Sequence, residues 1–413
     1  MPASTADEPT KPGKRTVPPV SHGLPSPDHV RRVLEGVVDP ELHASIVELG
    51  MVREVEVRPG GQVVVEVALT TAGCPLRAQI RQDVESKVAS LAGVHGVEVR
   101  YAEMTPAERS AVMQRARWNA RERAPDTEIP GATRVLAIAS GKGGVGKSSV
   151  TVNVAAALAA RGLTVGVLDA DIWGFSVPRM LGVDGRLGGT NGKIHPHEVE
   201  VPNDDPASAP GRIKVVSMGF LVDDEGTALM WRGLILSRAL EQFLTDVRWG
   251  PMDYLLVDMP PGTGDVQMAL GRLLPRTELL VVTTPALAAQ KVAVRVADMA
   301  RRSYLRIAGV VENMSAFVAP DGTEHAIFGE GGGAALAAEI GAPLVGRVPI
   351  EPRVSSGGDS GLPVTLADPD APASAEFRRI AARIVEEMLP PVEMAGCTAR
   401  ILELAETAAA LER

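Results

Sequence analysis

Hydrophobic positions in the second half of the chain form short continuous runs separated by helical patterns. The first run, "RVLAIAS" from residue 134, is the apolar kind of strand that is buried inside a parallel sheet. Six further runs follow it: TVGVLDA, IKVVSM, YLLVDM, ELLVVTT, IAGVVEN and PLVGRVP. This alternation of strands and helices predicts an α/β fold, with a doubly wound and mostly parallel sheet, over residues 131–370.

A different pattern in residues 24–102 predicts a small α+β domain. "DHVRRVLEGVVDPEL" has helical spacing, and "VREVEVRPGGQVVVEVAL" reads as two alternating strands around a Pro-Gly-Gly turn. An amphipathic helix, "CPLRAQIRQDVESKVASL", and a last strand, "GVEVRY", follow. The expected element order is therefore α-β-β-α-β.

Three segments remain outside these two domains. Residues 1–23 are rich in Pro, Ser and Thr and predict a disordered tail. Residues 103–130 are charged and predict a partly helical linker. Residues 371–413 carry two helical patterns, separated by Pro390 and Pro391.

Composition narrows the class of protein. A chain of 413 residues, 45% of them hydrophobic, can bury the cores of two or three domains. A net charge of -9 argues against nucleic acid as a partner. No apolar run is long enough to span a bilayer, and the N-terminus lacks the apolar core of a secretory signal. The two cysteines make no disulfide framework. We expect a soluble, cytoplasmic protein.

The segment "GKGGVGKS" fits the phosphate-binding pattern G-x-x-x-x-G-K-[ST]. It follows a predicted buried strand and precedes a predicted helix, so backbone N–H groups and the helix N-terminus can face phosphates. We expect Lys147 to neutralise the β and γ phosphates of ATP, and Ser148 to ligate Mg²⁺. The predicted nucleotide-binding residues are Gly141, Lys142, Gly143, Gly144, Val145, Gly146, Lys147, Ser148 and Ser149.

Acidic residues end two of the predicted strands. Asp258 closes "LLVD", where a carboxylate can hold Mg²⁺. Asp169 and Asp171 close "VGVLDAD", and one of them can orient the attacking water. The alternative for Asp169 is a capping role at the strand end or at a helix.

The second lysine of the loop indicates a particular class of ATPase. "SGKGGVGKS" resembles the deviant Walker A motif of the MinD, ParA and nitrogenase iron protein class. That resemblance implies a homodimer in which Lys142 reaches across the interface to the partner's nucleotide. Added positive charge of this kind stabilises the transition state of phosphoryl transfer.

Further motifs narrow the resemblance to the Mrp/ApbC group of ATP-dependent iron-sulfur cluster carriers. They are LDADIWGFSVPRMLG, WRGLILSRALEQFL, DYLLVDMPPGTGD, GVVENMS, IFGEGGG and GRVPIEPRV. The small domain resembles SufT-like domains through "DPEL", "IVELGMV" and "GCPL". The resemblance implies slow ATP hydrolysis and, as partners, apoprotein clients or assembly factors.

The same resemblance assigns roles to three residues. Asp171 positions the hydrolytic water, Asp258 is the Walker B residue, and Asn313 reads the adenine edge. An Asn amide can pair with N6 and N7 of adenine. A turn amide that satisfies local backbone is the alternative for Asn313.

One departure from the family concerns the cluster itself. Relatives of this group carry a Cys-Pro-x-Cys pair after "ENMS", and two such pairs bridge a [4Fe-4S] cluster in the dimer. Here Ala319 and Pro320 stand in place of the first Cys-Pro, and no cysteine follows. Four thiolates are the usual ligands of such a cluster. We interpret Asp321, Glu324 and His325 as solvated loop residues rather than metal ligands.

Two cysteines and two histidines remain as candidate ligands. Cys74 precedes Pro75 at a predicted helix start, where the helix dipole favours the thiolate. It either binds iron during cluster transfer or is a partly buried capping thiol. Cys397 is expected to pack in the C-terminal segment, and His195 and His197 are expected at the surface.

Three functions are compatible with these residues. The first is an ATP-hydrolysing homodimeric iron-sulfur cluster carrier. The second is an ATP-switched positioning or scaffolding ATPase of the MinD/ParA type without its own cluster. The third is an adaptor whose small domain binds a client while ATP controls access.

Overall fold

The computed structural model describes residues 24–388, except 40–41, 43, 70–76, 123, 173, 222–232, 304 and 320. The predicted tail of residues 1–23, Cys74 and Cys397 lie outside the described residues. The chain divides between residues 116 and 117 into two compact units.

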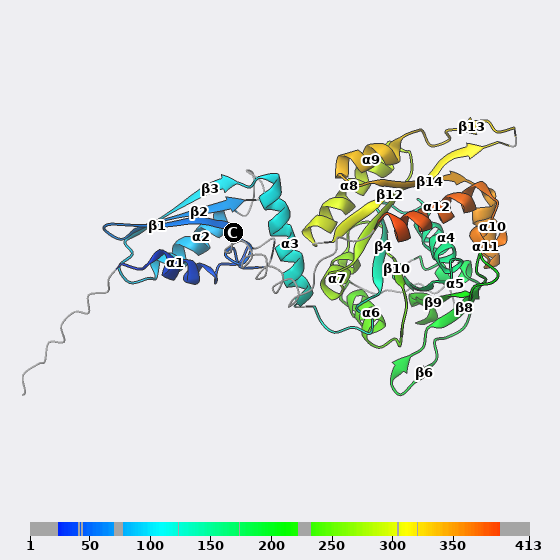
Figure 1. Cartoon of the computed structure of the whole chain (residues 1–413), viewed down its shortest axis with the longest axis horizontal. Helices are drawn as coiled ribbons and strands as arrows, with labels where there is room; N and C mark the ends of the chain where they lie inside the picture. Colours follow the sequence, from blue (N-terminus) through cyan, green and yellow to red (C-terminus); the bar gives the residue numbers. More distant parts are fainter. Residues whose placement is uncertain are drawn as a thin grey trace, which may run out of the picture. The chain divides into compact units, whose positions relative to one another are not determined.

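The first unit has the predicted α-β-β-α-β order (Figure 1). Its elements are α1 (Pro27–Leu34), β1 (Val52–Arg58), β2 (Gln62–Leu69), α2 (Arg77–Ala89) and β3 (Gly96–Glu103). β2 is the central strand, antiparallel to β1 and parallel to β3. Gly60 and Gly61 turn the hairpin with positive φ angles, which glycine adopts without steric cost. Apolar residues of both helices, among them Val30 and Ile80, are fully buried.

Helix α3 (Pro106–Glu122) occupies much of the predicted linker. Thr105 and Glu108 form a reciprocal capping box, because each accepts a hydrogen bond from the backbone N–H of the other. Val112 and Ala116 are buried, and Glu108 also pairs with Arg53 of β1 at 2.8 Å. The beginning of α3 therefore packs as part of the first unit, although its many charges resemble a linker.

The second unit is built on a sheet of nine strands among the described residues. They are β4 (Arg134–Ser140), β5 (Thr164–Asp169), β8 (His197–Val201), β9 (Gly211–Ser217), β10 (Tyr254–Asp258), β11 (Glu278–Thr283), β12 (Arg306–Val318), β13 (Glu324–His325) and β14 (Leu344–Ile350). The order is β13-β12-β11-β4-β10-β5-β9-β8, and β14 pairs with β12. Only β8 and β13 pair antiparallel with their neighbours, so the predicted mostly parallel sheet is confirmed.

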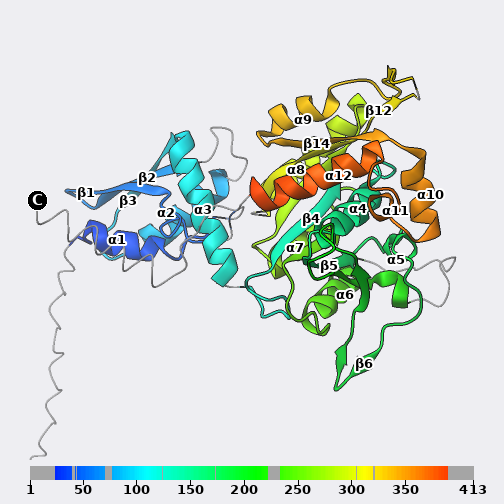
Figure 2. The ribbon, with the colours of Figure 1, turned by 45° about the vertical axis from the view of Figure 1, so that its right-hand side comes forward.

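Helices cover both faces of this sheet (Figure 2). One face carries α4 (Lys147–Ala159), α12 (Pro372–Glu386) and the short α5 (Val177–Met180), α10 (Pro352–Ser360) and α11 (Val364–Ala367). The other carries α6 (Gly233–Thr245), α7 (Asp265–Leu273), α8 (Leu287–Arg302) and α9 (Gly332–Ile340). Alternate residues of β4 enter the two cores, Ile138 on the first face and Ala137 on the second. In the part of the chain that is described, no helix is long and apolar enough to cross a membrane.

Helix α12 belongs to the core of the second unit, beyond the predicted domain end at residue 370. Phe377, Ile380 and Ile384 are fully buried, and Arg134 of β4 donates to the carbonyl oxygen of Ile384. Pro372 lies in the first turn of α12, where the missing N–H is tolerated. The proline therefore starts a core helix rather than ending the domain.

The burial of α12 predicts the effect of truncating its central aromatic side chain. Phe377→Ala is expected to lower the free energy of unfolding by about 3–5 kcal/mol, because it leaves a cavity in the core. Glu386→Ala, on the same helix, removes an exposed ion pair with the distant Arg161 and is expected to cost about 1 kcal/mol or less. Urea unfolding of the full chain measures the free energy of unfolding of both variants. Equal losses of this free energy would contradict the placement of α12 in the core.

Candidate functional site

The crossover from β4 into α4 forms a glycine-rich loop beside a cavity of about 240 Å³. Gly144 and Gly146 both have a φ of 78°, a left-handed conformation that glycine adopts readily. Gly141 lies against α8, where an added Cβ would meet the backbone N of Ala293 at 2.5 Å. The cavity is lined by Ser140, Gly143, Gly144, Val145, Gly146, Lys147, Ser148, Ser149, Asp171, Gly174, Ser176, Met180 and Pro261.

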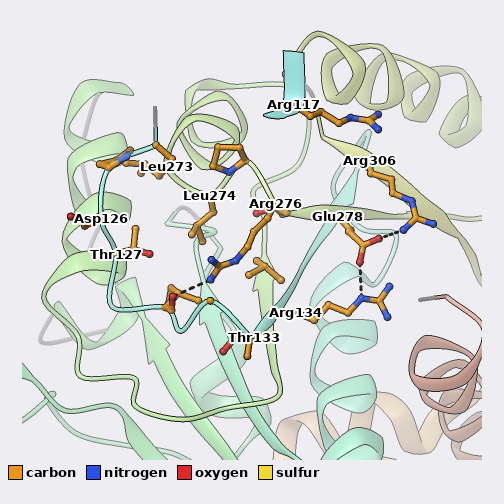
Figure 3. Close-up of a pocket in the computed structure, with 18 residues that line it drawn as sticks. Arg117, Asp126, Thr127, Thr133, Arg134, Leu273, Leu274, Arg276, Glu278 and Arg306 are labelled. Carbon is orange, nitrogen blue, oxygen red and sulfur yellow. Dashed lines mark hydrogen bonds and ion pairs between the residues drawn. The ribbon is translucent and has the colours of Figure 1, made fainter. Parts of the chain in front are cut away.

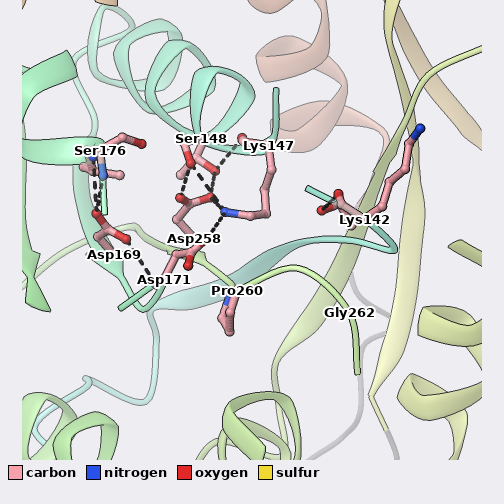
Figure 4. Close-up of polar contacts among 12 residues, drawn as sticks. Lys142, Lys147, Ser148, Asp169, Asp171, Ser176, Asp258, Pro260 and Gly262 are labelled. Atoms are coloured by element: carbon pink, nitrogen blue, oxygen red, sulfur yellow. Dashed lines mark hydrogen bonds and ion pairs between the residues drawn. The ribbon is translucent and has the colours of Figure 1, made fainter. Parts of the chain in front are cut away.

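Lys147 is the first residue of α4, and its side chain is only 7% exposed. Its Nζ lies 2.8 Å from Asp258 Oδ1 and 3.6 Å from Asp171 Oδ2 (Figure 4). A buried ammonium requires such compensation, because removing a lone charge from water is costly. The structure therefore brings three predicted site residues together at the carboxyl ends of neighbouring strands.

Asp258, at the end of β10, is fully buried and accepts two hydroxyl hydrogen bonds. Ser148 Oγ donates to Oδ2 at 2.6 Å, and Thr151 Oγ1 donates to Oδ1 at 2.9 Å. Ser148 and Asp258 thus offer adjacent oxygen atoms, the ligand type that Mg²⁺ prefers. Thr151 was not predicted, although a hydroxyl one helical turn after Lys147 was a readable signal.

Asp169 is a fully buried hub that fixes the segment after β5. Its carboxylate accepts from the backbone N–H groups of Asp171, Ser176 and Val177, each at 3.2 Å. Ser217, at the end of β9, donates its hydroxyl to the same carboxylate at 3.1 Å. Burial, and next the negative charge of Asp258, raise the pKa of Asp169 to about 7. The bonds from the N–H groups of Ser176 and Val177, at the start of α5, support the capping alternative for Asp169.

Asp171 faces the cavity, in contrast to Asp169. Burial raises its pKa, while the ammonium of Lys147 acts in the opposite direction. Figure 4 shows its side chain on the same side as Lys147 and Asp258. Asp171 lines the cavity of about 240 Å³ beside the glycine-rich loop, which we call the phosphate cavity. A carboxylate there is placed for contact with water or phosphate.

Asn313 is buried and holds the phosphate loop from β12. Its Nδ2 donates to the carbonyl oxygen of Val145 at 2.8 Å. The next residue, Met314, has a φ of 56°, a strained value for a residue with a side chain. Register shifts between Asn313 and Phe317 accompany this strain. The bonded carbonyl oxygen lies 168 residues away in sequence and Asn313 lies within β12, so Asn313 is not the turn amide of the alternative. Its contact with adenine stays a prediction.

Lys142 is exposed at the mouth of the loop. Its side chain extends away from the cluster of Lys147 and Asp258 (Figure 4). Lys142 forms no ion pair with any residue that the structure describes. Its role toward a partner's nucleotide stays a prediction.

The described residues on both sides of residue 320, where the resemblance places a cysteine pair, connect β12 to the antiparallel β13. Ala319 accepts from Gly322 N–H and donates to the Thr323 carbonyl oxygen, and Asp321 Oδ1 accepts from Thr323 N–H at 2.9 Å. Hydrogen bonding by the backbone N–H of Thr323, and next by its side chain, lowers the pKa of Asp321. Asp321, Glu324 and His325 are exposed.

Within the described part of the chain, no group of three His, Cys, Asp or Glu side chains is arranged to hold a metal ion. His195 bonds the hydroxyl of Thr190 at 2.7 Å, and His197 packs its ring on Phe220. The predicted iron ligand Cys74 lies outside the described residues.

A second cavity, of about 750 Å³, lies at the opposite ends of the strands (Figure 3). Glu278, at the start of β11, accepts from Arg134 and Arg306 at 2.6 Å each. Arg276 donates to the carbonyl oxygens of Ile129 and Pro130. These contacts tie the beginnings of three strands together, which is a structural role far along the sheet from the phosphate loop.

The glycine-rich loop between β4 and α4, with its buried lysine beside the aspartate that ends β10, defines a P-loop nucleotide-binding protein. A family model described as NUBPL iron-transfer P-loop NTPase matches residues 131–385. The chain belongs to this family. A second model, described as iron-sulfur cluster assembly protein, matches residues 27–100.

Curated relatives carry one common name. The iron-sulfur cluster carrier protein of Mycobacterium tuberculosis is 46% identical over 359 residues, which are 85% of this chain and 91% of the relative. The protein of the same name from Synechocystis is 41% identical over 366 residues, covering 86% and 96%. A solved structure of a nucleotide-binding protein from Archaeoglobus fulgidus, in complex with ADP, is 32% identical, covers 59% of this chain and 91% of that one, and has a TM-score of 0.46.

From the hydrogen bond of Thr151 to Asp258 we predict that substitutions of Thr151 change the affinity for nucleotide. Thr151→Val keeps the shape of the side chain but removes the hydrogen bond to the buried Asp258 carboxylate, which is worth about 1.5–3 kcal/mol. We expect affinity for Mg-ADP to fall by roughly tenfold or more. Thr151→Ser, which keeps the hydroxyl, should retain the affinity of the wild-type protein. Fluorescence titration with a labelled nucleotide compares the three proteins, and equal affinity of the Val and wild-type proteins would contradict the prediction.

Proposed function

We propose that this protein is an ATP-hydrolysing homodimer that carries iron-sulfur clusters and transfers them to apoproteins. The observation that carries the proposal is the ammonium of Lys147, buried beside Asp258 and Asp171 behind a glycine-rich loop. The name shared by the curated relatives supports the nature of the cargo.

ATP is bound by the phosphate loop and by the side chains of Lys147 and Asn313. Backbone N–H groups of residues 143–149 surround the phosphates, and Lys147 exchanges its carboxylate partners for phosphate oxygens. Asn313 contacts the adenine edge from β12. Ser148 and Asp258 hold Mg²⁺, which neutralises phosphate charge when bound.

Hydrolysis requires groups on both sides of the γ-phosphate. Asp171 orients the attacking water from within the same chain. Lys142, exposed and without an ion pair among the described residues, reaches the nucleotide of the second subunit and stabilises the charge that develops there. ATP occupancy and dimer closure are thereby linked.

The cargo requires ligands other than the β12–β13 hairpin. Iron in such clusters is bound by thiolates, and this sequence contains only Cys74 and Cys397. We propose Cys74 as the iron-binding thiolate, because it lies in the segment that matches the iron-sulfur assembly family.

The alternative of an ATP-switched scaffold without cargo is less well supported. It rests on the missing cysteine pair alone. The family description and the names of the relatives both refer to iron or iron-sulfur transfer.

The two loop lysines are expected to separate binding from turnover. Lys147→Ala should abolish nucleotide binding, because phosphate charge is left uncompensated. Lys142→Ala should leave binding within about threefold and lower kcat by roughly 10³-fold, as loss of an arginine finger does. Nucleotide titration and phosphate release measure the two effects. Normal turnover by Lys142→Ala would refute the role of this residue in the partner's site.

Iron content is expected to depend on Cys74. After anaerobic reconstitution with iron and sulfide, the wild-type dimer should retain both elements, and Cys74→Ala should lose most of them. Cys397→Ala is the matched control for Cys74→Ala, because it removes the other cysteine of the chain. A wild-type protein that retains no iron would favour the scaffold function, while full retention by Cys74→Ala would move the site to other ligands.

A further inference from the structure

The loop that joins β10 to α7, residues 259–264, borders two neighbouring cavities. One is the phosphate cavity, and the other has a volume of about 530 Å³ and is lined in part by Ile172, Leu236 and Val266. Pro261 lines both cavities, so the placement of this loop sets one wall of the phosphate site.

Backbone contacts attach the loop to β4 from one side. Met259 N–H donates to the carbonyl oxygen of Ile138 at 3.1 Å, and Gly262 N–H donates to that of Ser140 at 2.9 Å. Pro260 and Pro261 have no N–H group to donate. The tip of the loop is therefore held by bonds that its carbonyl oxygens accept from elsewhere.

Gln267 supplies those bonds. Its Nε2 donates to the carbonyl oxygens of Pro260, at 2.8 Å, and Gly262, at 3.1 Å. Its Oε1 accepts from the N–H of Gly264 at 2.9 Å. The side chain is on the first turn of α7 and the residue is 1% exposed. One buried amide thus bonds the residues on both sides of Pro261 and the start of the helix.

The chemistry of this site selects an amide. Two carbonyl oxygens require two donors, and the Gly264 N–H requires an acceptor, which together match the groups of a glutamine side chain. A glutamate is an acceptor only when ionised and would face two carbonyl oxygens in a buried space. A methionine has similar length and no amide.

We propose that Gln267 is a positioning residue for ATP hydrolysis, which acts by holding Pro261 and the β10–α7 loop against the phosphate cavity. The inference rests on the proposed ATPase function. Gln267 does not line the phosphate cavity, so it acts through the loop and not on the nucleotide. Its loss leaves the phosphate loop, Lys147 and Ser148 in place.

The experiment compares kcat, KM and nucleotide affinity for the wild-type chain, Gln267→Met and Gln267→Glu. We expect kcat to fall by about tenfold or more in both variants, because small misplacements in a catalytic site are costly to rate. Affinity for ADP should stay within about threefold. The matched control is Gln290→Met, which removes a similar bond to the Pro285 carbonyl oxygen at the neighbouring β11–α8 crossover. It should leave kcat within about twofold.

Hydrogen exchange supplies a second measurement that does not depend on turnover. The amides of Gly262 and Gly264 should exchange faster in Gln267→Met than in wild type, with amides of the central strands unchanged. If Gln267→Met does not fold, Gln267→Asn, which keeps the amide but shortens the reach, is measured in the same way.

Each outcome has one meaning. If the wild-type protein hydrolyses ATP and folded Gln267→Met has the same kcat, the positioning role is wrong. An equal loss in Gln290→Met also overturns it, since any loop-anchoring amide would then have the same effect. Absence of turnover in the wild-type protein instead refutes the proposed ATPase function, and the exchange measurement then reports separately whether Gln267 holds the loop.

Discussion

The second unit depends on one buried positive charge. The ammonium of Lys147 is compensated by Asp258 and Asp171, and Asp258 is in turn bonded by Ser148 and Thr151. These residues come from α4 and from the ends of two adjacent strands, β10 and β5. Because β10 lies between β4 and β5 in the sheet, their carboxyl ends meet at one edge. The strand order therefore assembles a site that neither the loop nor the strands form alone.

The fold was predictable because its signals are local. Each buried strand is a continuous apolar run, and the glycine-rich loop follows the first of them. The sheet order and the antiparallel edge strands depend on pairing between distant segments, which no local pattern contains. The sequence predicts α3 as part of a linker and α12 as a C-terminal helix outside the domain, because exposed charges and prolines conceal the buried face of each helix.

The candidate site, like the fold, contains residues that local motifs predict and residues whose roles depend on distant partners. Lys147, Ser148 and Asp258 belong to motifs with a fixed spacing, and the structure brings them together. Thr151, Ser217 and Gln267 act through partners that are distant in sequence or through a loop whose path is tertiary. A polar residue inside an apolar stretch is ambiguous until its hydrogen-bond partners are known. The roles of Asp169 and Asp171 separate only when burial shows which carboxylate faces the cavity.

Gly141 offers no free space between the phosphate loop and the backbone of α8. Two rigid elements in such close contact transmit displacement, since interiors are nearly incompressible. An added Cβ at position 141 would lie 2.5 Å from the backbone of Val292 and Ala293, so only glycine allows the loop to lie this close to α8. The path of the phosphate loop is therefore fixed against a helix that contributes no residue to the lining of the phosphate cavity.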